Sequence, residues 1–232
     1  MFSRRMTEDH NRAFETALQS IVEVSGQEGV FAADDIITFH RHVGFRSDTR
    51  FLQSFFAAEP SDLERCLAWR LHVLCWAGDH ASSTPGDFVQ CGARSGLKAA
   101  TVARYVDLGG VGKSFHVYDP CDARSPEAAE ARRQRLGTLF GVVLDEATPL
   151  ARVAAAAPPK IAWLHLDVAQ ASAEEMILEG LIGRVSPNGL VLVEEYGSNR
   201  RADSVAAADR IAAANNCAFM ELPTGQGLLI KA

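Results

Sequence analysis

Hydrophobic positions change their spacing near residue 87. Apolar residues earlier in the chain, such as those between Phe14 and Val22, recur at helical spacing, which predicts helices. From Asp87 onward, short apolar runs alternate with helix-like stretches, a pattern typical of βαβ units and a parallel sheet. We therefore expect an N-terminal helical cap over residues 1–80 and an α/β core over residues 81–232, together forming one compact domain.

Six apolar runs after the cap have the length and composition of strands. They are Phe88–Cys91, Phe115–Tyr118, Ile161–Leu166, Leu190–Val193, Ala218–Leu222 and Leu228–Ile230. Candidate helices follow the first four runs at Lys98–Val106, Pro126–Leu136, Ala173–Ile182 and Arg201–Ala214. The last two runs are too close for a crossover helix, so they should pair antiparallel. The pattern predicts a doubly wound, Rossmann-like α/β sheet, mostly parallel with an antiparallel last strand.

The composition argues against several kinds of partner, including nucleic acids and membranes. The chain has 232 residues and a formal net charge of -6, so it lacks the basic field of a nucleic-acid-binding protein. Arg132, Arg133 and Arg135 are interpreted as part of a solvated helix face. Five scattered cysteines without CxxC spacing argue against a disulfide framework or a zinc site and suit a reducing cytoplasm. No apolar run approaches the roughly 18 residues of a membrane span, so we expect no membrane partner.

A strand followed by two glycines is the first candidate binding motif. Residues 88–96 have the sequence FVQCGARSG, in which an apolar run leads directly into Gly92 and Gly96 and then into a helix. Glycine permits a positive φ and a close approach of the backbone to a nucleoside-bearing ligand. On this motif alone, a tight turn that only packs the helix against the sheet is an equally good interpretation.

Acidic residues end three later strands. Asp119 follows the second run, where a carboxylate can accept hydrogen bonds from ribose hydroxyls, although an aspartate beginning a turn explains it equally well. Asp167 follows the third run, and Glu194 and Glu195 follow the fourth. Carboxylates meeting at one sheet edge repel each other unless a cation compensates them. The alternative is that one acid faces inward and the others are solvated, since neighbouring residues alternate faces. His165 is interpreted as a core histidine.

In their order and spacing, these motifs resemble the macrocin O-methyltransferase-like (TylF-type) class I S-adenosylmethionine-dependent methyltransferases. The resembling segments are GDFVQCG at 86–92, Tyr118-Asp119, Leu166-Asp167, VEEYG at 193–197 and LPTGQGL at 222–228. They lie within residues 63–232 in unbroken order. The resemblance implies a seven-stranded sheet, S-adenosylmethionine as cofactor, and methyl transfer to a hydroxyl of a small-molecule or glycan-like acceptor.

The resemblance also implies roles for individual residues. The cofactor would contact Gln90, Gly92, Ala93, Arg94, Ser95, Gly96 and Asp119. A divalent ion, most simply Mg²⁺, would bind Asp167, Glu194 and Glu195, because their oxygen ligands suit a hard cation. Asp167 and Glu195 would then take part in catalysis by binding and activating the acceptor hydroxyl. The helical cap would cover the crevice and supply much of the acceptor pocket. A homo-oligomer is compatible with this organisation.

Two departures from the family pattern keep a second interpretation open. Gln90 stands where relatives carry an acid, and Ala169 stands where relatives often carry a second acid, a candidate general base. A catalytically silent relative that binds S-adenosylmethionine or a partner protein would tolerate both changes. A nicotinamide-dependent oxidoreductase is disfavoured, because residues 92–96 lack the three-glycine spacing of dinucleotide sites.

Overall fold

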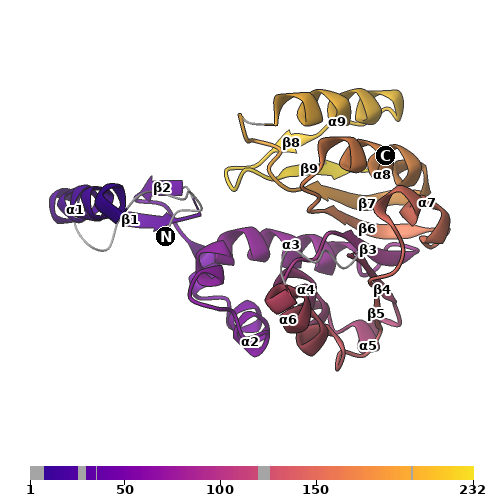
Figure 1. The fold of residues 1–232 in the computed structure, drawn as a ribbon, viewed down its shortest axis with the longest axis horizontal. Coiled ribbons are helices and arrows are strands. Elements are labelled where there is room, and N and C mark those ends of the chain that lie inside the picture. The colour runs from indigo at the N-terminus through magenta and orange to yellow at the C-terminus, as the bar shows by residue number, and fades with distance from the viewer. Residues whose placement is uncertain (1–7, 26–29, 35, 120–125, 200) are drawn as a thin grey trace.

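A seven-stranded sheet lies at the centre of the computed structural model, which describes residues 8–25, 30–34, 36–119, 126–199 and 201–232 (Figure 1). Its strand order is β5-β4-β3-β6-β7-β9-β8. The strands are β3 (Asp87–Cys91), β4 (Phe115–Tyr118), β5 (Val142–Asp145), β6 (Ile161–Leu166), β7 (Val185–Val193), β8 (Met220–Glu221) and β9 (Gly227–Ile230). Strands β3 to β7 are parallel, and β9 runs antiparallel to both β7 and β8. The predicted fold class is confirmed.

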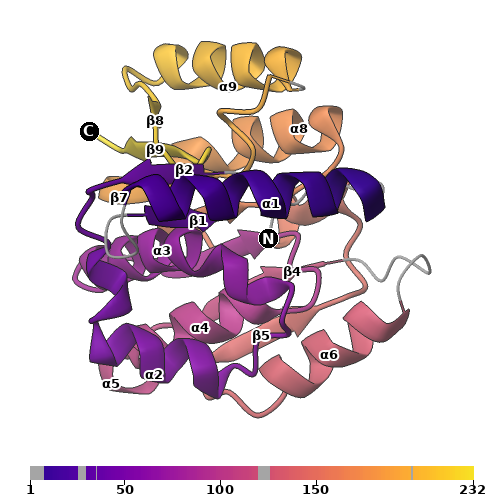
Figure 2. The same ribbon diagram turned by 90° about the vertical axis from the view of Figure 1, so that its left-hand side faces the viewer.

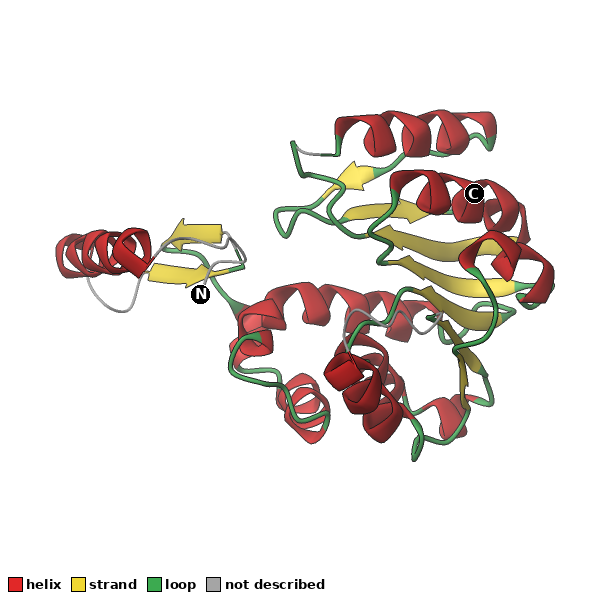
Figure 3. Ribbon diagram, in the orientation of Figure 1, coloured by secondary structure: helices red, strands yellow, loops and turns green. Residues whose placement is uncertain are grey.

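Helices cover both faces of this sheet (Figure 3). They are α2 (Thr49–Ala57), α3 (Ala68–Ala81), α4 (Leu97–Val106), α5 (Leu108–Val111), α6 (Pro126–Leu136), α7 (Val153–Ala156), α8 (Ala171–Leu181) and α9 (Ala202–Ala214). Helices α3 and α4 pack on one face, and α8 and α9 pack on the other. Among the described residues, none of the helices combines the length and apolar content that crossing a membrane requires.

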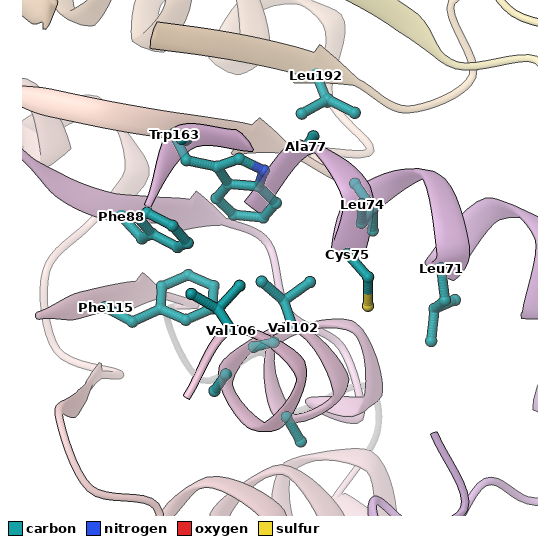
Figure 4. Packing of buried hydrophobic residues seen from close by; sticks show 14 of the residues in the cluster. Leu71, Leu74, Cys75, Ala77, Phe88, Val102, Val106, Phe115, Trp163 and Leu192 are labelled. Atoms are coloured by element: carbon teal, nitrogen blue, oxygen red, sulfur yellow. The ribbon is translucent and has the colours of Figure 1, made fainter. Parts of the chain in front are cut away.

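Alternation along the strands builds a core on each face. Phe88 and Trp163 point toward α3 and α4, whereas their neighbours Val89 and Leu164 point toward α8. Figure 4 shows Phe88, Phe115 and Trp163 gathered beside α4, and the ring centroids of Phe88 and Trp163 lie 5.5 Å apart. Because α3 packs directly on β6 and β7, the end of the predicted cap shares its core with the sheet.

One strand of the sheet has no counterpart among the six apolar runs. Strand β5 pairs in parallel with β4 at the edge of the sheet. It has four residues, and Val143 is half exposed, so neither its length nor its hydrophobicity distinguishes it from a loop. The sheet therefore extends further beyond β4 than the sequence pattern indicates.

The prediction that residues 1–80 are helical is wrong for one segment. After α1 (Glu8–Ser25), an antiparallel hairpin is formed by β1 (Val30–Ala33) and β2 (Ile36–Phe39). Each strand is rich in β-branched and aromatic residues, which favour an extended backbone. Figure 1 shows α1 and this hairpin standing apart from the helices that cover the sheet, and Figure 2 views them from the front, with the rest of the molecule behind them. Phe31 attaches the hairpin to the rest of the molecule through edge-on contacts with Phe45 and Trp69.

Candidate functional site

The order of the parallel strands reverses between β3 and β6. Strands β4 and β5 follow on one side of β3, while β6 and β7 follow on the other. In doubly wound sheets, ligands bind beyond the carboxyl ends of the strands at this point. The turn that begins at Gly92 follows β3, and Asp119, Asp167 and Glu194 follow β4, β6 and β7. The topology therefore brings the sequence-predicted motifs to one edge of the sheet.

The turn after β3 depends on its two glycines. Gly92 has a φ of +80°, and a Cβ atom there would overlap the carbonyl oxygen of Asp167. Gly96 has a φ of +79° and directly precedes α4. No side chain among the described residues caps the N-terminus of α4, and uncapped amides at a helix start can bind a polar ligand. The backbone here can approach a ligand closely.

Asp119 is fixed beside this turn. Its Oδ2 atom accepts a hydrogen bond from the Ala93 amide at 3.1 Å and another from Arg132 Nη1 at 2.6 Å. Arg132 also donates to Glu146 and to the carbonyl of Arg94. Burial raises the pKa of Asp119, and the neighbouring guanidinium opposes this shift. The interpretation of Arg132 as a solvated residue is wrong, because it is buried under the candidate ribose site.

Of the other predicted cofactor residues, three use their side chains within the protein; one of them, the mostly exposed Arg94, has its Nε 3.5 Å from Asp167 Oδ2. Gln90 is fully buried, and its Nε2 donates to the carbonyl of Gly92 at 3.0 Å. The Ser95 hydroxyl donates to Glu64, which lies just before α3. Gln90 therefore supports the turn from beneath, and Ser95 connects the turn to the segment preceding α3.

The three predicted metal ligands differ in their surroundings. Asp167 and Glu194 are buried, whereas the Glu195 side chain is 51% exposed. The Lys98 ammonium, on the first turn of α4, lies 3.0 Å from Asp167 Oδ2 and 3.0 Å from Glu194 Oε1. Burial lowers the pKa of Lys98, but the two carboxylates outweigh burial and the net shift is upward. A protein cation thus lies between two of the acids.

Glu194 is the most densely bonded of these acids. Besides Lys98, its carboxylate contacts Arg70 Nη1 at 2.5 Å, His165 Nε2 at 3.0 Å and Gln226 Nε2 at 3.1 Å. Burial would raise the pKa of Glu194, but Lys98, His165 and Arg70 hold it well below its ordinary value. His165 is buried as predicted, and it also belongs to this network.

The magnesium site predicted from these acids does not fit the structure. Among the described residues, no three metal-ligating side chains are grouped so that they could hold an ion. The physical reason is that Lys98 and Arg70 already bind the oxygens of Asp167 and Glu194. Glu195, the second predicted catalytic acid, is half exposed, and its Oε1 atom lies 3.6 Å from Arg70 Nη1.

A cavity of about 270 Å³ lies beside Ala169, the position where relatives often carry an acid. Its lining is mostly polar and comprises Ala169, Ala171, Asn199, Arg201, Ala202, Asp203 and Ser204. Arg201 donates to the carbonyl of Val168 at 3.0 Å. This hydrogen bond connects the lining of the cavity to the segment that follows β6. This space lies next to Asp167 along the chain and can receive a small polar molecule.

Sequence reasoning missed three residues that surround Glu194. Arg70 carried a usable signal, since a charge within the apolar stretch 67–76 indicates a buried ion pair. Lys98 follows the glycine turn closely, but its direction depends on how α4 is rotated against the sheet. Gln226 lies in the connection between β8 and β9, and its contact with Glu194 follows from the pairing of β9 with β7.

Comparisons with known proteins show a likeness in fold. No protein-family model and no curated protein match the sequence. The O-methyltransferase NovP is 17% identical over 70% of this chain and 79% of its own, with a TM-score of 0.54. CalS11, a TDP-rhamnose 3'-O-methyltransferase in calicheamicin biosynthesis, is 15% identical over 82% and 96%, with a TM-score of 0.56. The Podospora anserina methyltransferase PaMTH1, bound to SAH, is 11% identical over 99% of both chains, with a TM-score of 0.56. The chain therefore has the Rossmann-like fold of these methyltransferases.

Proposed function

We propose that this protein transfers a methyl group from S-adenosylmethionine to a hydroxyl of a small-molecule or sugar-like acceptor. The observation that carries the proposal is the placement of Asp119 beside the Gly92 turn, where the strand order reverses. A carboxylate in this place can accept hydrogen bonds from both hydroxyls of a ribose, and the glycine backbone leaves room for the nucleoside. The TylF-type resemblance and the shared fold agree with this assignment.

We infer the direction of the bound cofactor from the strand order. With the ribose at the end of β4 and the glycine turn at the end of β3, the methionine part extends toward β6. We expect its methyl group to lie toward the end of β6, after which Asp167 and the cavity residue Ala169 follow along the chain. The polar lining of that cavity suits an acceptor rich in hydroxyls.

The chemistry is a displacement at the methyl carbon. An acceptor oxygen forms a bond to this carbon while the carbon–sulfur bond breaks, the hydroxyl proton is released, and S-adenosylhomocysteine leaves. The protein contributes mainly by holding the two reactants at the correct distance and angle. The resemblance of the motifs and the O-methyltransferase activities of NovP and CalS11 favour oxygen as the attacking atom.

The proposal is tested with purified protein, S-adenosylmethionine carrying a labelled methyl group, and a panel of sugar nucleotides, glycosides and phenols. Label in an acceptor, together with formation of S-adenosylhomocysteine, is the expected result. Cofactor binding without transfer to any acceptor would favour the silent relative, an alternative motivated by Gln90 and Ala169. Absence of cofactor binding would refute both the methyltransferase and a silent relative that binds S-adenosylmethionine.

A further inference from the structure

Six charged side chains meet at the carboxyl ends of β6 and β7. Three are acids, namely Asp34, Asp167 and Glu194, and all three are buried. Three are cations, namely Arg70, Lys98 and Arg94, which lie within 3.5 Å of one or more of these acids. In this group, which we term the acid–base cluster, Arg94 is 70% exposed, so Arg70 and Lys98 are the cations that face the buried acids.

Lys98 occupies the centre of the acid–base cluster. Its Nζ atom lies 3.0 Å from one oxygen of Asp167 and 3.0 Å from one oxygen of Glu194, so it bridges acids that follow two neighbouring strands. The Lys98 side chain is 14% exposed. Lys98 is the second residue of α4, directly after the glycine turn. A single cation that bridges two carboxylates from neighbouring strand ends is the arrangement expected of a bound metal ion.

We propose that the Lys98 ammonium is the permanent cation of this site and takes the place in which a divalent ion would otherwise bridge Asp167 and Glu194. If the chain transfers methyl groups, as proposed above, the reaction needs no divalent ion. Only this consequence of the inference rests on the proposed function. Lys98 is then a positioning residue that holds the two strand-end acids together.

The bonding of Glu194 supports this inference. A carboxylate offers about four acceptor positions, and four donors already contact Glu194. An incoming ion would have to displace one of them. Gln226 and His165 are fully buried, so either side chain would lose a hydrogen bond in a place that water does not reach.

Repulsion between positive charges also opposes the binding of a divalent ion. A divalent ion between Asp167 and Glu194 would lie beside the Lys98 ammonium and the Arg70 guanidinium, which already contact these acids. Uncompensated charge is costly at such depth. Removal of Lys98 would reverse the situation, because Asp167 and Glu194 would then lack the cation between them. We therefore expect the variant without this ammonium, and not the natural protein, to bind a divalent ion.

The test is a titration with Mn²⁺, followed by electron paramagnetic resonance of the free ion, on cofactor-free protein. The wild type, Lys98→Met, Lys98→Arg and Lys160→Met are compared; Lys160 is exposed and serves as the matched control. We expect no stoichiometric binding by the wild type, Lys98→Arg or Lys160→Met. Lys98→Met should bind Mn²⁺ at least about tenfold more tightly than the wild type, and Mn²⁺ should raise its thermal midpoint selectively.

Stoichiometric Mn²⁺ binding by the wild type would overturn the inference, and so would a folded Lys98→Met protein that binds no more Mn²⁺ than the control. If Lys98→Met does not fold, the wild type and Lys98→Arg decide: absence of binding in both supports the inference, and binding in either refutes it. The titration needs neither cofactor nor acceptor. Its outcome is therefore independent of whether the chain transfers methyl groups.

Discussion

Gly92 holds a backbone conformation that other residues adopt only with strain. Its φ of +80° is unfavourable for a side chain, and an added Cβ would collide with backbone atoms of Asp167, which cannot rotate away. Gly92→Ala should therefore lower the free energy of unfolding by about 2–4 kcal/mol and weaken cofactor binding. Urea unfolding and calorimetry with S-adenosylhomocysteine measure the two effects.

Gly112 provides the control for this substitution. It has a φ of +66°, but a Cβ atom there would meet nothing within 4 Å. Gly112→Ala should cost only about 1 kcal/mol, from backbone strain, and should leave cofactor binding unchanged. Equal effects of the two substitutions would show that the contact with the Asp167 backbone does not matter.

The acids of the site could be predicted from the sequence, but their partners could not. Asp119, Asp167 and Glu194 directly follow apolar runs, and the carboxyl ends of parallel strands share one edge of the sheet. Arg70 and Lys98 reach Glu194 from α3 and α4, so their contacts depend on how two helices pack. A sequence pattern indicates which face of a helix is buried, but not which atoms meet there. This explains why an external metal was expected where the protein supplies cations.

Glu64 connects three elements around the cofactor turn. Its carboxylate accepts hydrogen bonds from the Ser61 amide at 2.9 Å and from Arg135 of α6 at 3.0 and 2.9 Å, and it contacts the Ser95 hydroxyl. Arg135 also donates to the carbonyl of Ser95 at 3.1 Å. The segment before α3, helix α6 and the turn before α4 are therefore joined through one carboxylate.

This connection predicts a dependence of stability on pH. Burial would raise the pKa of Glu64, but its bonds to Arg135, Ser95 and Ser61 lower it from 4.5 to about 2. A lowered folded-state pKa contributes stability that is complete above pH 4.5 and is lost as the pH falls toward 2. Glu64→Gln should cost about 1 kcal/mol at pH 7, less than the full shift implies, because solvent screens this partly exposed group.

Urea unfolding at a series of pH values measures this cost, with Glu179→Gln on exposed α8 surface as the control. The difference between the wild type and Glu64→Gln should shrink below pH 4.5, whereas the control should stay within about 0.5 kcal/mol of the wild type throughout. A difference that grows in acid would contradict the assigned direction of the pKa shift.

Elements with a clearly buried apolar face were predictable, whereas three four-residue strands without a fully buried residue were not. Strand β6, with all six residues buried, and helix α4 follow directly from the pattern. Strand β5 and the β1–β2 hairpin have four residues per strand, and the residues that make them strands also occur in loops and helices. Their conformation is decided by pairing partners, which the local sequence does not specify.

In the described part of the N-terminal segment, the hairpin contacts the site. Asp34, at the end of β1, accepts a hydrogen bond from Arg70 Nε at 2.8 Å, so the hairpin belongs to the acid–base cluster. Figure 1 shows α1 beyond the hairpin, further from the sheet. The two parts of this segment should therefore contribute differently to the whole molecule.

Two truncations separate these contributions. Deletion of residues 1–25 should change the thermal midpoint little, whereas deletion of residues 1–40 removes Asp34 and Phe31 and should lower it by about 5–10 °C. If the segment also lines the acceptor pocket, the longer deletion should alter acceptor preference. Differential scanning calorimetry checks the midpoints. Equal midpoints for the two truncated proteins would contradict the assigned role of the hairpin.

The most direct test of the whole account is a calorimetric titration of S-adenosylhomocysteine into the wild type and Asp119→Ala, with Asp79→Ala, an exposed acid paired with Arg50, as the control. We expect one S-adenosylhomocysteine to bind per chain. Loss of the charge-assisted contact to the ribose should weaken binding in Asp119→Ala by about one to two decades, and the control should match the wild type. No binding by the wild type, or an unchanged Kd for Asp119→Ala, would contradict the account.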